Sequence, residues 1–137
     1  MTEYDYSESH VAAVAALAAD LNLVAPAGFY AASPAVLRRC YNGIGPDRWS
    51  GRFRKKVTEL LEWFEPEALI HDWEYTFMPK TYAAFTLANL RFAANAAAAA
   101  GQLEPGAIPV LRRIGRGLLL ALLCQLFGWQ GFRDAEP

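Results

Sequence analysis

A histidine and an aspartate stand side by side within residues 67–75. If this stretch is helical, His71 and Tyr75 share a face because they are four residues apart, whereas Asp72 is rotated by about 100° and can serve another partner. A histidine that is held by an acceptor can take a proton from water, and an adjacent carboxylate can bind a hard cation such as Ca²⁺. The pair could therefore combine a general base with a calcium ligand.

A glycine-spaced turn, Tyr41-Asn42-Gly43-Ile44-Gly45-Pro46, precedes this stretch. Calcium takes about six to eight oxygen ligands, and backbone carbonyls of such a turn can supply several of them. A bound cation would polarise an ester carbonyl, while backbone N–H groups would assist the developing oxyanion. The residues permit a calcium-assisted hydrolytic site, but their pattern does not say which turn faces which helix.

Helical elements must position these residues, because no alternating run of strand length is present. Ser7 and Ser33 are expected to cap helices, and Pro34, Pro66 and Pro79 suit first helical turns. The expected helices cover residues 8–22, 34–39, 52–64, 67–76, 79–100 and 109–127. Gly101 and Gly128 are expected to end the last two. The sequence thus predicts an all-α domain of four to six helices.

Four features receive a structural interpretation first. The alanine run at residues 96–100 predicts close packing against a neighbouring helix, and the leucine stripe of the last helix is expected to be core. That stripe consists of Leu118, Leu119, Leu122 and Leu126. Glu67 is expected at the surface, although its position four residues before His71 also allows it to partner the histidine. His10 is expected to be a surface residue without a role.

The composition is that of one globular domain spanning residues 1–137, with 54% hydrophobic and 20% charged residues. A net charge of -1 predicts no bulk attraction to nucleic acid, so nucleic acid is not an expected partner. The acidic start of the chain is not typical of a signal peptide, and the uncharged runs at 21–37 and 117–132 are too short to span a bilayer. We therefore expect a soluble protein made in the cytoplasm, with any export by a non-classical route.

Residues 41–46 resemble the Tyr-x-Gly-x-Gly calcium loop of phospholipase A2 enzymes. Residues 68–75 are similar to their Cys-x-x-His-Asp-x-Cys-Tyr helix with both cysteines absent, as in disulfide-poor viral and bacterial members. Asn89 lies on a following long helix where the family has an aspartate. The resemblance covers about residues 40–95 and implies a small helical domain with a glycine-rich calcium loop and two central antiparallel helices.

The resemblance also implies roles for particular residues. Three backbone carbonyls and one carboxylate would bind Ca²⁺, namely those of Tyr41, Gly43, Gly45 and Asp72. The Gly43 N–H would stabilise the oxyanion. His71 would activate water against the sn-2 ester of a glycerophospholipid, Asn89 would orient its ring, and Tyr75 would hydrogen-bond Asn89. Val11, Val14, Leu17 and Ile44 would line an acyl channel.

The sequence departs from the family pattern at three points. Asn89 is a neutral acceptor, which can fix the tautomer of His71 but stabilises an imidazolium less than a carboxylate does. The whole helix expected at residues 52–64 lies between Gly45 and His71. Pro46 stands where many members have a further glycine, and it lacks a backbone N–H.

Two functions therefore stay open: a calcium-dependent lipid esterase, and a catalytically weak or inactive lipid-binding or phage-associated structural protein of the same fold. In both, the partner is a phospholipid membrane surface or a lipid substrate. A basic segment with Trp49 and Phe53 interleaved is either a solvated face or a dock for anionic lipid. Its cations are Arg38, Arg39, Arg48, Arg52, Arg54, Lys55 and Lys56. Cys40 and Cys124 could pair, but two buried thiols are the favoured interpretation.

Overall fold

The structure, a computed structural model, describes residues 7–41 and 62–136. Within these residues it contains helices and no strand, which confirms the prediction of an all-α protein with four to six helices. The elements are α1 (Glu8–Asp20), α2 (Pro34–Cys40), the short 3₁₀ helix η1 (Glu62–Phe64), α4 (Glu65–Phe77), α5 (Tyr82–Leu103), α6 (Ala107–Phe127) and α7 (Trp129–Asp134).

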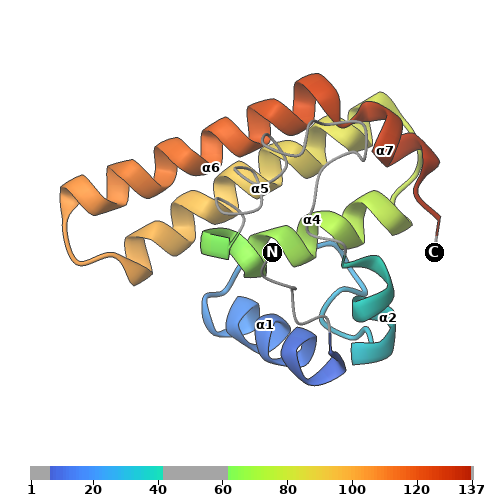
Figure 1. Ribbon diagram of the computed structural model, residues 1–137, viewed down its shortest axis with the longest axis horizontal. Coiled ribbons are helices and arrows are strands. Elements are labelled where there is room, and N and C mark those ends of the chain that lie inside the picture. Colours follow the sequence, from blue (N-terminus) through green and yellow to red (C-terminus); the bar gives the residue numbers. More distant parts are fainter. Residues whose placement is uncertain (1–6, 42–61, 137) are drawn as a thin grey trace.

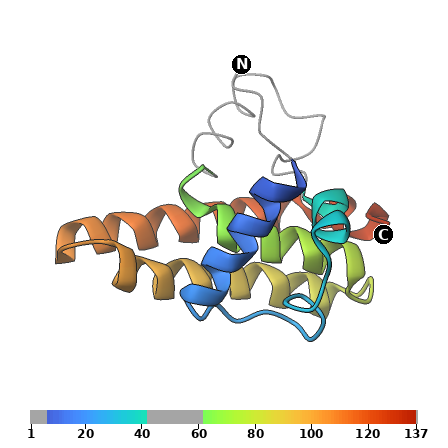
Figure 2. The same ribbon diagram turned by 90° about the horizontal axis from the view of Figure 1, so that it is seen from below.

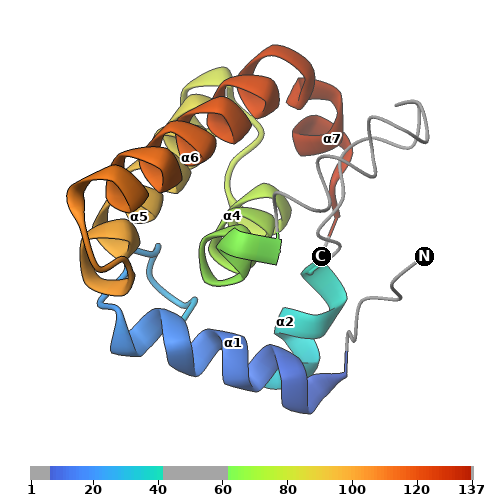
Figure 3. The same ribbon diagram turned by 60° about the vertical axis from the view of Figure 1, so that its left-hand side comes forward.

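The helices form two layers. Helices α5 and α6 lie side by side as a long antiparallel hairpin, and α4 runs beside α5 in the opposite direction (Figure 1). Helix α1 crosses this layer from below (Figure 2), and together α1 and α2 cover the side of α4 that faces away from α6 (Figure 3). Helix α4 is therefore enclosed by its neighbours, and its side chains point into the interior in several directions.

The helix starts follow local capping chemistry. The side chains of Ser7, Ser33 and Thr81 each accept a hydrogen bond from a backbone N–H three residues later, at 3.1 to 3.3 Å. Pro34 and Pro66 occupy the first turns of α2 and α4, where a missing N–H costs nothing. The predicted caps at Ser7 and Ser33 are confirmed.

Two of the predicted boundaries of α5 are wrong. The helix begins at Tyr82 rather than at Pro79, because Thr81 provides the cap. It also continues through Gly101 to Leu103, since a glycine inside a helix costs only about 1 kcal/mol and the chain turns at 104–106 instead. Gly128 ends α6 as predicted, with its N–H donating to the carbonyl of Cys124 at 2.7 Å.

Close packing between α5 and α6 depends on small residues. Ala88, Ala96, Ala99 and Ala100 are fully buried, which confirms the prediction for the alanine run. A Cβ atom on Gly117 would lie 2.6 Å from the Cβ of Ala96, so the two helices approach too closely for any larger residue at position 117. The small residues set the spacing of the hairpin.

The leucine stripe of α6 is not core, contrary to the sequence prediction. Leu118, Leu119, Leu122 and Leu126 are between 47 and 63% exposed. Helix α6 is apolar on most of its circumference, and its packed side is formed by Gly117, Leu120 and Ala121. Across residues 7–41 and 62–136, no helix combines the length and the apolarity needed to cross a membrane.

Candidate functional site

His71, Tyr75 and Asn89 meet between α4 and α5. His71 and Tyr75 share one face of α4, and Asn89 faces them from the inner side of α5. The His71 Nε2 and Asn89 Oδ1 atoms are 2.7 Å apart, and the Tyr75 hydroxyl donates to the same oxygen at 2.9 Å. The predicted hydrogen bonds of Asn89 with His71 and with Tyr75 are thus confirmed.

Gln125 on α6 fixes the orientation of the Asn89 amide. Asn89 Nδ2 donates to Gln125 Oε1 at 2.8 Å, while Gln125 Nε2 donates to Tyr82 and Thr86 at 3.1 and 3.0 Å. Asn89 must therefore present its oxygen to the histidine. His71 Nε2 then carries the proton, and Nδ1 is left with a lone pair that can accept one.

Sequence reasoning missed Gln125, although it carries a signal. Apart from Cys124, it is the one polar residue in the apolar run 117–127. A polar side chain in such a run generally needs a buried partner.

Burial keeps His71 neutral. Its side chain is 7% exposed, and its ring lies 4.1 Å from the ring of Tyr75 and 5.6 Å from that of Phe92, centre to centre. Burial lowers the pKa of His71 to about 4, and the hydrogen bond with Asn89 opposes this shift. At neutral pH the ring is therefore an uncharged proton acceptor.

Asp72 lies beside this group, within electrostatic reach of two thiols. Burial, with a further contribution from the charge of Asp72, raises the pKa values of Cys40 and Cys124 to about 12. Both cysteines are unpaired thiols, as predicted, but only Cys40 is buried, whereas Cys124 is half-buried. Cys40 ends α2, which packs against α4, and the predicted calcium turn begins directly after it.

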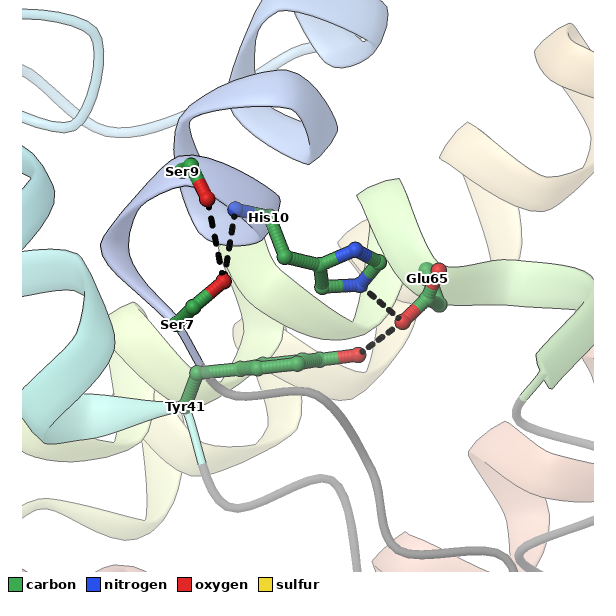
Figure 4. A network of polar contacts seen from close by, with 5 residues as sticks. All are labelled: Ser7, Ser9, His10, Tyr41 and Glu65. Carbon is green, nitrogen blue, oxygen red and sulfur yellow. Dashed lines mark hydrogen bonds and ion pairs between the residues drawn. The ribbon is translucent and has the colours of Figure 1, made fainter.

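Tyr41, the first residue of that turn, is fixed by its side chain (Figure 4). Its hydroxyl donates to Glu65 Oε1 at 3.1 Å, and His10 Nε2 lies 2.9 Å from the same oxygen. Ser7 caps the helix that carries His10. Glu65 therefore ties together the start of α1, the end of α2 and the start of α4. His10 is half-buried in this network, so the expectation that it has no role is wrong.

Several predicted residues lie outside the described part of the chain. They are Gly43, Gly45 and the rest of the turn, Ile44 and Pro46 included, the predicted helix up to residue 61, and the basic and aromatic residues from Arg48 to Lys56. Among residues 7–41 and 62–136, no cluster of three His, Cys, Asp or Glu side chains could hold a metal ion. The described donors, a carbonyl on Tyr41 and a carboxylate on Asp72, are oxygens of the kind that Ca²⁺ prefers.

Two carboxyl groups of α4 are buried. Glu67 and Glu74 are each 1% exposed, so the expected surface position of Glu67 is wrong. Glu74 pairs with Arg91, whose Nη1 lies 3.0 Å from its Oε2. Neither oxygen of Glu67 has a hydrogen-bond partner on another of the described residues. Burial raises the pKa of both carboxyl groups to about 7. Glu67 was expected at the surface because it lies near the start of α4, but the helices packed around α4 bury it.

The residues expected to line an acyl channel separate in the structure. Val11 and Val14 lie in the core with 0 and 6% exposure, whereas Leu17 is 41% exposed. The valines pack with the apolar side of α4, including Leu69 and Ile70. Of the three expected channel residues that the structure describes, Leu17 alone is available to a ligand.

Comparisons of the chain with models of protein families, with curated proteins and with solved structures find no match. Function is therefore inferred from the residues and their geometry. The site combines a neutral histidine held through Nε2 with an adjacent carboxylate. Such a set suits proton abstraction from water next to a hard cation.

Proposed function

We propose that this protein is a phospholipase A2-like domain that hydrolyses the sn-2 ester of glycerophospholipids with the help of Ca²⁺. The observation that carries the proposal is the hydrogen bond of 2.7 Å between His71 Nε2 and Asn89 Oδ1, supported by Tyr75. This bond orients the ring and leaves Nδ1 free to act as the base.

The residues support a simple proton path. His71 Nδ1 takes a proton from a water molecule, and the water oxygen forms a bond to the sn-2 carbonyl carbon. When the ester C–O bond breaks, the proton passes from His71 to the departing glycerol oxygen. The products are a free fatty acid and a lysophospholipid, so atoms and charge balance.

Asp72 and the carbonyl of Tyr41 are the described groups that would hold Ca²⁺, together with the carbonyls of Gly43 and Gly45. Their oxygen chemistry supports this assignment, as does the packing of α2, which Tyr41 follows, against α4, which carries Asp72. Bound there, Ca²⁺ would polarise the ester carbonyl, with the Gly43 N–H as a further donor.

A second function has a specific observation in its favour. The partner of His71 is the neutral amide of Asn89, and burial already lowers the pKa of His71 to about 4. Nothing in this pair stabilises the imidazolium that must form during proton transfer. The alternative is therefore a lipid-binding or assembly protein that keeps the fold and has little or no turnover.

The test is fatty-acid release from phospholipid vesicles by the purified protein. The esterase should release fatty acid with Ca²⁺, stop on chelation, and lose activity in His71→Gln, which keeps a neutral polar side chain but has no titratable base. Hydrolysis unchanged in His71→Gln would rule out the mechanism.

A binding experiment separates the two functions. If the wild type is inert, calcium binding is measured as a shift of the melting temperature, with Asp72→Asn as the test and the exposed Asp20→Asn as the control. Stabilisation that is lost only in Asp72→Asn supports the binding protein. No stabilisation in the wild type contradicts the calcium site.

A further inference from the structure

The outer face of the α5–α6 hairpin is apolar, and no helix of the described part of the chain covers it. Leu87 and Leu90 of α5 and Leu111, Leu118, Leu122 and Leu126 of α6 are each between 45 and 67% exposed. The two helices lie side by side along their length (Figures 1 and 3). Single exposed leucines are ordinary on protein surfaces, but an extended apolar face on two adjacent helices marks a site of interaction.

The spacing on α6 shows that this face is one continuous stripe. Leu111, Leu118, Leu122 and Leu126 follow the three- and four-residue steps of a single helix face. Gly115 lies in the same stripe, and a Cβ atom built on it would meet nothing within 4 Å. The stripe therefore faces outward for about four turns, with no other described helix packed over it.

The charged residues of helices α5 and α6 themselves are all positive. Neither α5 nor α6 contains an aspartate or a glutamate, whereas α6 carries Arg112, Arg113 and Arg116. Glu104, in the turn between the helices, pairs with Arg113, their Oε1 and Nη1 atoms 3.2 Å apart. Arg112 is exposed, and Arg116 stacks over the exposed ring of Trp63 at 4.4 Å. The apolar face is thus bordered by cations.

We propose that the α5–α6 face docks on an anionic phospholipid surface, with the hairpin lying flat. Its leucines would enter the boundary between headgroups and acyl chains, and Arg112 and Arg116 would reach the phosphates beside them. Charge complementarity favours this partner over a second copy of the chain, whose identical face carries the same positive charge.

This surface is separate from the His71 site. Asn89 lies on the inner side of α5 and Gln125 forms hydrogen bonds toward α5, so the outward leucines do not contact the histidine network. The inference goes beyond the proposed hydrolysis and does not depend on it. A protein without turnover would bind vesicles through the same face.

Vesicle co-sedimentation of the full chain tests the proposal. The vesicles contain phosphatidylcholine alone or with about a third phosphatidylglycerol. The double variant Leu118→Gln/Leu122→Gln should bind the anionic vesicles at least about tenfold more weakly, because two leucines no longer enter the membrane. Arg112→Gln should weaken binding to anionic vesicles only, and by less at high salt.

The matched control is Val24→Gln, which changes a side chain that is 62% exposed but lies outside the hairpin. It should bind like the wild type, and circular dichroism should show that all variants remain folded. Equal binding by the double variant and the wild type, or no binding by the wild type, would overturn the proposal. So would sedimentation of the wild type as a dimer that the double variant dissociates, because a second copy would then cover the face.

Discussion

At the scale of single residues, the amide of Asn89 determines how strong a base His71 can be. A carboxylate at this position would place a negative charge 2.7 Å from Nε2 and raise the pKa of His71 above its value of about 4. A neutral amide orients the ring but offers little to the imidazolium. Orientation and base strength are therefore separate properties of this site.

We predict that Asn89→Asp increases the rate of fatty-acid release by about ten- to a hundredfold. The substitution keeps an acceptor for His71 and Tyr75 and adds the charge that stabilises the protonated ring. The acid limb of the pH–rate profile, expected near pH 4 in the wild type because His71 must be neutral, should move to higher pH. Initial rates measured across pH on mixed lipid vesicles check both effects.

The control for this change is Asn89→Ala, which removes the acceptor and should lose activity. A faster Asn89→Asp enzyme whose acid limb does not move would contradict the role assigned to the charge. Gln125 must rotate its amide to face the new carboxylate, so the folded state of each variant is compared by urea unfolding.

A second prediction at the residue scale concerns how Glu67 makes the stability of the protein depend on pH. Its folded-state pKa of about 7 lies above its ordinary value of 4.5, so the unfolded chain releases this proton at lower pH than the folded chain. This carboxyl group therefore lowers the free energy of unfolding as pH rises from about 4.5 to 7. The free energy of unfolding of Glu67→Gln, minus that of the wild type, should therefore increase between pH 4 and pH 8. The expected increase is on the order of 2 kcal/mol.

Urea unfolding at the two pH values measures this effect. The exposed Glu8→Gln serves as the control and should give the same difference from the wild type at pH 4 and pH 8. If Glu67→Gln also behaves in that way, the carboxyl group is not held in its neutral form by burial.

At the scale of the elements, two glycines of the hairpin have opposite roles. Gly101 lies in α5, and a Cβ atom there would meet nothing within 4 Å, whereas a Cβ atom on Gly117 would lie 2.6 Å from that of Ala96. Gly101→Ala should therefore raise the free energy of unfolding by up to about 1 kcal/mol through helix propensity. Gly117→Ala should lower it by about 1 to 3 kcal/mol, because the helices must separate. Thermal or urea unfolding of the two variants tests the pair, and equal signs would contradict the packing.

The helix starts were predictable because capping is local. Ser7 and Ser33 each bond a backbone N–H within the next three residues, and no distant residue is needed for that. The end of α5 was not predictable from Gly101, since a glycine can either stop a helix or continue it at modest cost. The end of α5 at Leu103 depends on the turn that follows and on its tertiary contacts.

At the scale of the molecule, Asn95 holds the two layers together. Its Oδ1 accepts the backbone N–H of Val24 at 2.9 Å, and its Nδ2 donates to the carbonyl of Val24 at 2.8 Å. Asn95 is 2% exposed, so loss of its side chain would remove both partners in a region with little water. The clamp joins the segment after α1 to the middle of α5.

We predict that Asn95→Ala lowers the free energy of unfolding by about 2 to 4 kcal/mol. Gln102→Ala is the matched control, because this amide also bonds the segment after α1, at Leu21 O, but is exposed and should cost less than about 1 kcal/mol. Chemical denaturation measures both. If both variants lose a similar free energy of unfolding, burial does not determine how much the hydrogen bonds of Asn95 stabilise the protein.

The sequence by itself determined the helical class, the helix caps and the shared face of His71 and Tyr75, because these depend on residues within one or two turns of one another. The position of Asn89 on the next helix was inferred from resemblance, and the two hydrogen bonds it makes were confirmed. The glycine turn at residues 42–46 lies outside the described residues and stays a prediction.

Only the tertiary structure decided which groups are covered. Gln125 orients the Asn89 amide from a third helix, Glu67 is buried by the helices around α4, and the leucines of α6 face outward. Burial depends on which neighbours pack against a helix. A helix as apolar as α6 offers several faces of similar hydrophobicity, and its sequence alone does not select one of them.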